Sequence, residues 1–97
     1  MIEHIVLIKF SSNTTEEQKK ELIRRTLLLK EKIPGILDIQ QGFNFSERSQ
    51  GYEVGLTVRF LNRDALENYG PHPAHQEIVT YLKEIGLEDS IIVDFEI

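Results

Sequence analysis

The sequence predicts one α+β domain whose strands and helices follow the order β-α-β-β-α-β. Two observations predict this order. Apolar residues alternate along 2–10, 52–60 and 90–97, as in strands, and stretches with helical apolar spacing lie between them, bounded by caps and glycine–proline breaks. A chain of 97 residues can bury a real but thin core, so we assign residues 1–97 to a single domain.

The first strand, at 2–10, should be covered on both faces. One face would carry Ile2, His4, Val6, Ile8 and Phe10. The other face includes Ile5 and Leu7, whereas an antiparallel sheet with one solvated face would show polar residues there. Further strands are expected at 36–45, 52–60 and 90–97.

The first helix should begin near residue 15 and end near residue 32, before Pro34-Gly35. Its start has capping-box spacing at either of two pairs, Thr14 with Glu17 or Thr15 with Gln18. Its spacing predicts a core-facing stripe formed by Leu22, Ile23, Thr26, Leu27, Leu29 and Ile33.

The second helix is expected in two pieces. Asn62 would cap a short piece that ends at Tyr69, and Gly70-Pro71 would break it. His72 would then cap a longer piece over 73–85, with proline at its first position, where a missing amide costs nothing.

This order is that of the ferredoxin-like fold, an antiparallel sheet with helices on one face. The uncovered face would expose Ile5, Leu7 and other apolar side chains, and soluble monomers rarely expose a large apolar patch. The simplest way to cover it is a two-fold dimer whose sheets face each other. We therefore expect a homodimer through the sheet faces, a dimeric α/β barrel.

Composition excludes several classes of function. The net charge of −5 disfavours nucleic acid, which binds basic surface patches. Cysteine is absent, which removes disulfides, thiolate catalysis and cysteine-based metal sites. No apolar run is long enough to span a membrane, and no signal peptide is visible. We expect a cytoplasmic protein without nucleic-acid or membrane partners.

The candidate site centres on His75. The spacing of His75, Ile78 and Leu82 places them on one helical face, so His75 should point toward the sheet. The nearby helix N-terminus disfavours a charged ring, which leaves a neutral imidazole suited to acid–base chemistry with Tyr69 as partner. We expect a modest apolar pocket around this pair, with ligand-binding residues His4, Val6, Ile8, Ile23, Leu27 and Leu56.

Other interpretations stay open. His75 could be a buried histidine bonded to a backbone carbonyl, and His72 a cap. The pair also forms H-x-x-H, which would need His4, Asp94 or Glu96 as a third metal ligand. No serine lies in a nucleophile-elbow context, and no glycine-rich phosphate loop is present. We expect no metal and no cofactor.

Five segments in order resemble the stress-responsive A/B barrel domain family, called Dabb. They are His4-Ile5-Val6-Leu7-Ile8-Lys9-Phe10; Ile33-Pro34-Gly35-Ile36 with Gly42, Asn44 and Ser46; Val58-Arg59-Phe60 with Asp64, Ala65, Leu66 and Tyr69; His72-Pro73-Ala74-His75; and Val93-Asp94-Phe95. The resemblance covers essentially the whole chain. It implies a ferredoxin-like protomer whose sheets pair into a dimeric barrel.

The resemblance also implies roles for three residues. In a plant polyketide cyclase of the family, the histidine matching His75 is the general base of an aldol condensation. The tyrosine matching Tyr69 orients the substrate, and the histidine matching His4 lines the pocket. That cyclase has aromatic residues on its first helix where this chain has Leu22, Ile23 and Thr26.

Four functions follow as hypotheses. The first is a small homodimer that binds an apolar or amphipathic molecule between sheet and helices. The second is a cyclase, isomerase or lyase that uses His75 as base and Tyr69 as polar partner. The third is a structural or stress-related assembly module without chemistry, and the fourth is a cofactor-independent monooxygenase.

Overall fold

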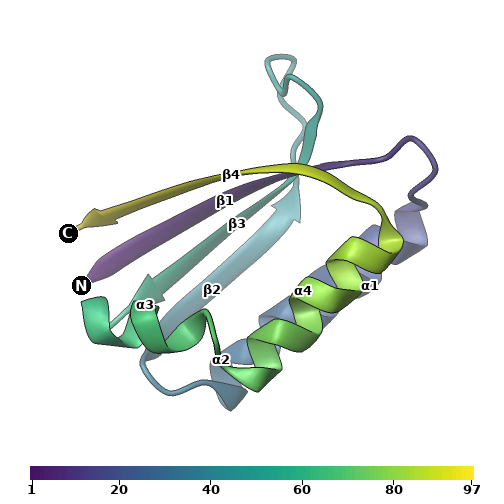
Figure 1. Cartoon of the computed structure of the whole chain (residues 1–97). Coiled ribbons are helices and arrows are strands. Elements are labelled where there is room, and N and C mark those ends of the chain that lie inside the picture. The colour runs from purple at the N-terminus through teal and green to yellow at the C-terminus, as the bar shows by residue number, and fades with distance from the viewer.

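The structure, a computed structural model, describes all residues from 1 to 97. Its elements are β1 (Ile2–Phe10), α1 (Glu16–Leu27), α2 (Leu29–Lys32), β2 (Ile36–Phe43), β3 (Tyr52–Phe60), α3 (Arg63–Tyr69), α4 (Pro73–Ile85) and β4 (Leu87–Glu96). The four strands form one antiparallel sheet in the order β2-β3-β1-β4. All helices lie on one face of this sheet (Figure 1), so the expected ferredoxin-like fold is confirmed. None of the helices combines the length and the apolar character needed to cross a membrane.

The first helix is interrupted at Leu28, where the sequence predicted a continuous helix to residue 32. The amide of Leu28 bonds the Arg25 carbonyl at 3.3 Å and that of Glu31 bonds the Leu28 carbonyl at 3.1 Å, so the turn is locally tighter than an α-helix. The tighter turn changes which side chains face the sheet. Leu29 is 1 % exposed, whereas Leu27 is 42 % exposed, so the predicted stripe was wrong at Leu27.

Two strand ends also differ from expectation. β2 ends at Phe43, and Phe45, predicted to belong to it, is almost fully exposed. β4 begins at Leu87 rather than residue 90, because Phe10 of β1 pairs with Leu87 in the sheet. Edge-strand limits depend on such long-range pairing, which local periodicity does not report.

The predicted caps are confirmed, and the capping-box alternatives are resolved. Thr15 caps α1 reciprocally with Gln18. Thr14 instead donates its buried hydroxyl to the Ile85 carbonyl at 2.5 Å, tying the start of α1 to the end of α4. His72 and Asn62 cap α4 and α3 with their side chains.

The core is divided into two clusters of buried side chains. One lies toward α2 and α3 and includes Ile33, Val58 and Phe60, while the other lies toward the opposite end of the sheet and includes Leu22 and Val54. Two partly buried residues, Val6 and Ile78, pack against both clusters. The space between the clusters is therefore where a cavity could form.

The face of the sheet opposite the helices carries the expected apolar patch, confined to one half. Ile5 and Leu7 of β1 pair in register with Val93 and Ile91 of β4, and Phe95 continues the row. The side chains contributed by β4 are 41 to 46 % exposed. The other half, from β2 and β3, is polar at Asp38, Gln40, Thr57 and Arg59.

Candidate functional site

A cavity of about 350 Å³ lies between the helix-facing side of the sheet and helices α1, α3 and α4. Eleven of its 17 lining residues are hydrophobic, which is the usual composition of a small-ligand site. Val6 and Ile78, which link the two core clusters, are among them. The exposed lining residues are Ser90 and Ile92, so the cavity opens between β4 and α4.

His75 enters the cavity from the first turn of α4. Its Nδ1 lies 2.9 Å from the Gly70 carbonyl oxygen, which also accepts a hydrogen bond from Gln76 Nε2 at 2.7 Å. Because a carbonyl only accepts, Nδ1 carries the proton and Nε2 keeps a free lone pair. Burial lowers the pKa of His75, opposed by the Gly70 hydrogen bond. The ring is therefore neutral at pH 7 and able to accept a proton at Nε2.

Tyr69, the last residue of α3, packs directly on this imidazole. The two ring centroids are 4.2 Å apart, and the tyrosine side chain is nearly fully buried. Burial raises the pKa of Tyr69 to about 12, so the phenol keeps its proton at neutral pH. Of the three tyrosine hydroxyls, those of Tyr52 and Tyr81 are hydrogen bonded within the protein and that of Tyr69 is not. It is thus a donor available to an occupant of the cavity.

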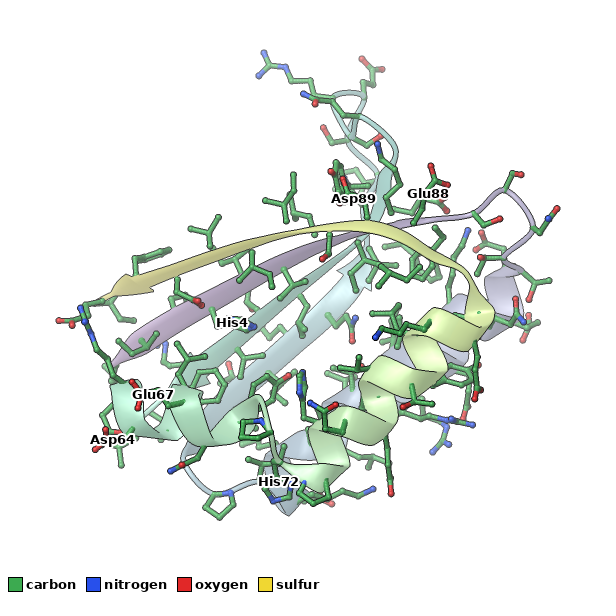
Figure 2. The ribbon with its side chains drawn as sticks, viewed as in Figure 1. His4, Asp64, Glu67, His72, Glu88 and Asp89 are labelled. Atoms are coloured by element: carbon green, nitrogen blue, oxygen red, sulfur yellow. The ribbon has the colours of Figure 1, made fainter.

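His4 completes an aromatic group on the floor of the cavity. Its ring meets those of Tyr69 and Phe60 edge-on, at centroid distances of 5.9 Å. His4 Nδ1 pairs with the Asp94 carboxylate, its register partner on β4. Figure 2 shows His4 reaching from the sheet toward the helices. The carboxylate orients the imidazole and favours a proton on Nδ1.

The structure brings most of the expected residues together. His4, Val6, Ile8, Leu56, Tyr69 and His75 all line the cavity. Ile23 and Leu27 do not: α1 presents Leu22 and Thr26 there, because the buried positions on this helix, Lys19, Leu22 and Thr26, are three and four residues apart. The prediction that Ile23 and Leu27 line the cavity was therefore wrong, because each lies one residue after the helix position that faces it.

Besides Thr26 and Ser90, the sequence interpretation missed a polar lining residue on β2, Gln41. It shares the helix-facing side of its strand with Ile39 and Phe43, so it is a polar residue in an otherwise apolar row. That interruption was the available signal.

His72 takes no part in the cavity. Its Nδ1 accepts the Ala74 amide at 3.1 Å, as a helix cap, and the ring lies at the turn before α4 (Figure 2). No group of three histidine, aspartate or glutamate side chains is arranged to hold a metal ion. The H-x-x-H spacing is explained by one cap and one cavity residue.

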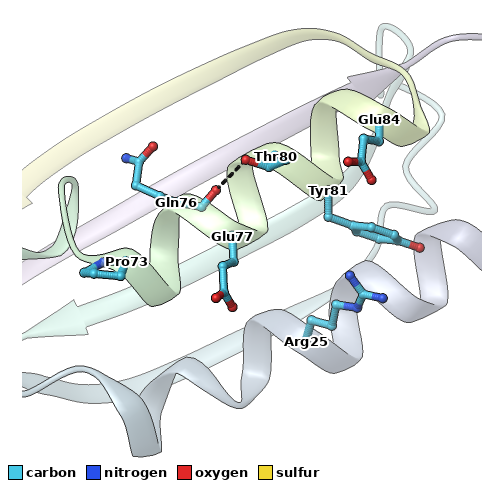
Figure 3. A pocket seen from close by; sticks show the side chains of 7 residues that line it. All are labelled: Arg25, Pro73, Gln76, Glu77, Thr80, Tyr81 and Glu84. Carbon is cyan, nitrogen blue, oxygen red and sulfur yellow. Dashed lines mark hydrogen bonds between the residues drawn. The ribbon is translucent and has the colours of Figure 1, made fainter.

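A second depression lies between α1 and the outer side of α4 (Figure 3). It is shallow and mostly polar, with only one hydrophobic residue in its lining. Arg25 stacks on Tyr81 there, with the guanidinium carbon 4.0 Å from the ring centroid, and Thr80 donates to the Gln76 carbonyl. These groups satisfy one another, so we place the candidate site in the cavity under the sheet.

Fold and site define a ferredoxin-like protein with an apolar cavity that contains a histidine–tyrosine pair. The chain belongs to the stress responsive A/B barrel domain family, Dabb, whose sequence profile matches residues 2–97. The resemblance described above is thereby confirmed.

Three proteins that this chain resembles differ in what is known of them. Olivetolic acid cyclase from Cannabis sativa is 29 % identical over 76 residues, covering 76 % of this chain and 75 % of that protein. A crystal structure from Arabidopsis thaliana superposes with a TM-score of 0.88 at 26 % identity, covering 99 % of this chain and 94 % of the other. A Bacteroides fragilis protein, described as dimeric and of unknown function, has a TM-score of 0.81 at 28 % identity over 99 % and 95 % of the two chains. Family membership therefore establishes the fold without selecting one reaction.

Proposed function

We propose that the protein is a homodimer that binds a small amphipathic carbonyl compound in the cavity beneath its sheet. The cavity supports this most directly, because it is mostly apolar and its lining includes the Tyr69 hydroxyl and His75 Nε2, neither of which has a protein partner. Dimerisation is supported by the exposed apolar row on β1 and β4 and by the dimeric description of the Bacteroides fragilis relative.

A second function is favoured by the state of the two rings. A neutral His75 with a free Nε2 can remove a proton from carbon next to a carbonyl. The Tyr69 hydroxyl can donate to the carbonyl oxygen as negative charge develops there, stabilising the enolate. Return of the proton to a different carbon completes an isomerisation, whereas attack of the enolate on a second carbonyl, with the proton held by His75 passed to the new alkoxide, completes an aldol cyclisation. The similarity to olivetolic acid cyclase supports this class of chemistry.

Binding is tested by blocking the cavity. A Val79→Phe substitution places a ring in the lining, and Thr80→Phe places the same ring on the outer groove as a matched control. We expect aryl ketones to shift amide resonances of cavity residues in the unmodified protein and in Thr80→Phe, but not in Val79→Phe. Equal shifts in all three proteins would place binding elsewhere.

Catalysis is tested without knowing the natural product. In deuterated water, the proposed base exchanges protons next to the carbonyl of a bound aryl ketone, which NMR records directly. We expect His75→Ala to lower this exchange about 100-fold to 10,000-fold. If the ketone binds but its protons do not exchange faster than in buffer alone, the protein binds ligands without this catalysis. If the ketone neither binds nor exchanges, the result favours an assembly module without chemistry.

A further inference from the structure

The amide of Gln41 is the unexplained polar group of this molecule. Its Oε1 and Nε2 are buried, and neither has a hydrogen-bond partner. They are the only side-chain nitrogen or oxygen atoms in the chain that are themselves fully buried and lack a partner, a set that does not include the Tyr69 hydroxyl. Buried polar groups without partners are rare and costly, so a retained one calls for an explanation.

The position of Gln41 shows that the fold does not supply a partner. Strand pairing places it in one row across the sheet with Leu56, Val6 and Ile92, all apolar and all lining the cavity. The hydroxyl that α1 contributes to the cavity lining, Thr26 Oγ1, donates to the Leu22 carbonyl at 2.8 Å. A dimer through the opposite face of the sheet would not reach this side of β2.

Gln41 lies on a different strand from His4, the sheet residue whose ring meets that of Tyr69. It is two strands away from β1, which carries His4, so roughly 10 Å of sheet separates the two ends at the usual strand spacing. The lining between them on the sheet is apolar, at Leu56 and Val6. An occupant that reaches both ends thus needs an apolar middle and two polar ends.

The chemistry of an amide specifies the second polar end. Oε1 accepts and Nε2 donates, so a group that both donates and accepts can give each of the two atoms a partner. A hydroxyl or a carboxamide does so. A carboxylate only accepts, faces the Gln41 oxygen with negative charge, and would be buried without a cation in the cavity lining.

We propose that Gln41 determines ligand specificity by hydrogen bonding a neutral hydroxyl or carboxamide at the far end of the molecule whose carbonyl meets Tyr69 and His75. This rests on the proposed ligand site and names its substrate class: a carbonyl compound with an apolar, ring-sized body and a neutral polar group at the other end. Gln41 is a specificity residue and takes no part in proton transfer.

The test uses three aryl ketones that differ at one position: phenyl butanone, its para-hydroxy derivative and its para-carboxy derivative. Dissociation constants are measured by NMR titration or calorimetry for the unmodified protein, Gln41→Leu and Gln40→Leu. The last is the matched control, because Gln40 has the same side chain one residue earlier, on the other face of the sheet.

We expect the unmodified protein and Gln40→Leu to bind the hydroxy ketone roughly 10-fold to 100-fold more tightly than phenyl butanone, and the carboxy ketone most weakly. In Gln41→Leu, the hydroxy ketone should lose this advantage. The melting temperature of unliganded Gln41→Leu should not fall, because leucine removes two unpaired polar atoms from an apolar row. Proton exchange need not be measured in this experiment, because the dissociation constants alone distinguish the three ketones.

The outcomes separate two failures. If the ketones bind the unmodified protein equally well, or if Gln41→Leu keeps the preference for the hydroxyl, Gln41 does not determine ligand specificity. The cavity would still be a ligand site in either case. If none of the three binds the unmodified protein at millimolar concentration, neither the ligand site nor the role of Gln41 stands.

Discussion

The imidazole of His75 and the phenol of Tyr69 lie with ring centroids 4.2 Å apart, and burial moves their pKa values in opposite directions. The histidine loses its proton more easily and the tyrosine holds its proton more tightly. At neutral pH one ring is therefore an acceptor and the other a donor. Both residues line the cavity, where His75 Nδ1 is bonded to Gly70 while His75 Nε2 and the Tyr69 hydroxyl have no protein partner.

The first prediction concerns Tyr69→Phe, which removes one oxygen and keeps the ring. Because the hydroxyl has no protein partner, the free energy of unfolding should change by less than about 1 kcal/mol. Exchange of ketone protons into deuterated water should fall about 100-fold to 1000-fold, since the enolate loses its donor. A large loss of stability with unchanged exchange would instead make Tyr69 a scaffold residue.

The second prediction concerns pH. The pKa of His75 is lowered by burial below its unfolded value of 6.5, so between the two pKa values the unfolded chain binds more protons than the folded one. The His75 contribution therefore makes the free energy of unfolding rise with pH through this window, and its destabilising effect is complete only below the folded pKa. Urea unfolding should be measured between pH 5 and pH 7. The free energy of unfolding should rise less steeply with pH in His75→Gln than in the unmodified protein.

The control for this experiment is His72→Asn, which keeps a capping side chain at the start of α4. In this variant, the free energy of unfolding should change with pH about as steeply as in the unmodified protein. If His75→Gln and the unmodified protein had identical slopes, the imidazole would not be desolvated in the folded state.

The third prediction concerns the apolar row on the open face of the sheet. Val93→Lys introduces a charge at a residue that is 46 % exposed and in register with Ile5. We expect the unmodified protein to sediment as a dimer at micromolar concentration and Val93→Lys as a monomer of 11.3 kDa. Thr80→Lys, on the outer side of α4, should remain dimeric. A monomeric unmodified protein would show that the row has another role.

The fourth prediction concerns the junction between α4 and β4. Gly86 has φ +115°, and a Cβ there would lie 2.6 Å from Thr14 Oγ1, the hydroxyl that bonds Ile85. Gly86→Ala should therefore lower the free energy of unfolding by about 1 to 3 kcal/mol in urea unfolding. Gly42→Ala is the control, because nothing lies within 4 Å of its added Cβ and its φ is not in the left-handed region. Similar losses in both variants would contradict the steric explanation.

The fifth prediction concerns the tautomer of His4. The Asp94 carboxylate accepts from Nδ1, so NMR of the imidazole nitrogens should show the proton on Nδ1 whenever the ring is neutral. Asp94→Asn removes the charge that favours this tautomer, and a mixture of the two neutral forms should appear. An unchanged tautomer would mean that the surrounding rings of Tyr69 and Phe60 orient His4 without the carboxylate.

By itself the sequence determined the element order, the caps at Thr15, Asn62 and His72, and the direction of His75. These depend on interactions within a few residues along the chain, such as side chain to backbone amide or one helical face, which spacing records. The same explanation applies to the six candidate site residues that line the cavity, because strand and helix periodicity identifies the buried face.

Only the tertiary structure decided the break at Leu28, the pairing of His4 with Asp94 and the unpartnered amide of Gln41. The first depends on how Leu29 reaches the core, and the second joins strands 90 residues apart in the chain. The third depends on packing in three dimensions, which leaves the Gln41 side chain without a hydrogen-bond partner. Local patterns report which face a residue occupies, whereas its partners are set by register and packing between distant segments.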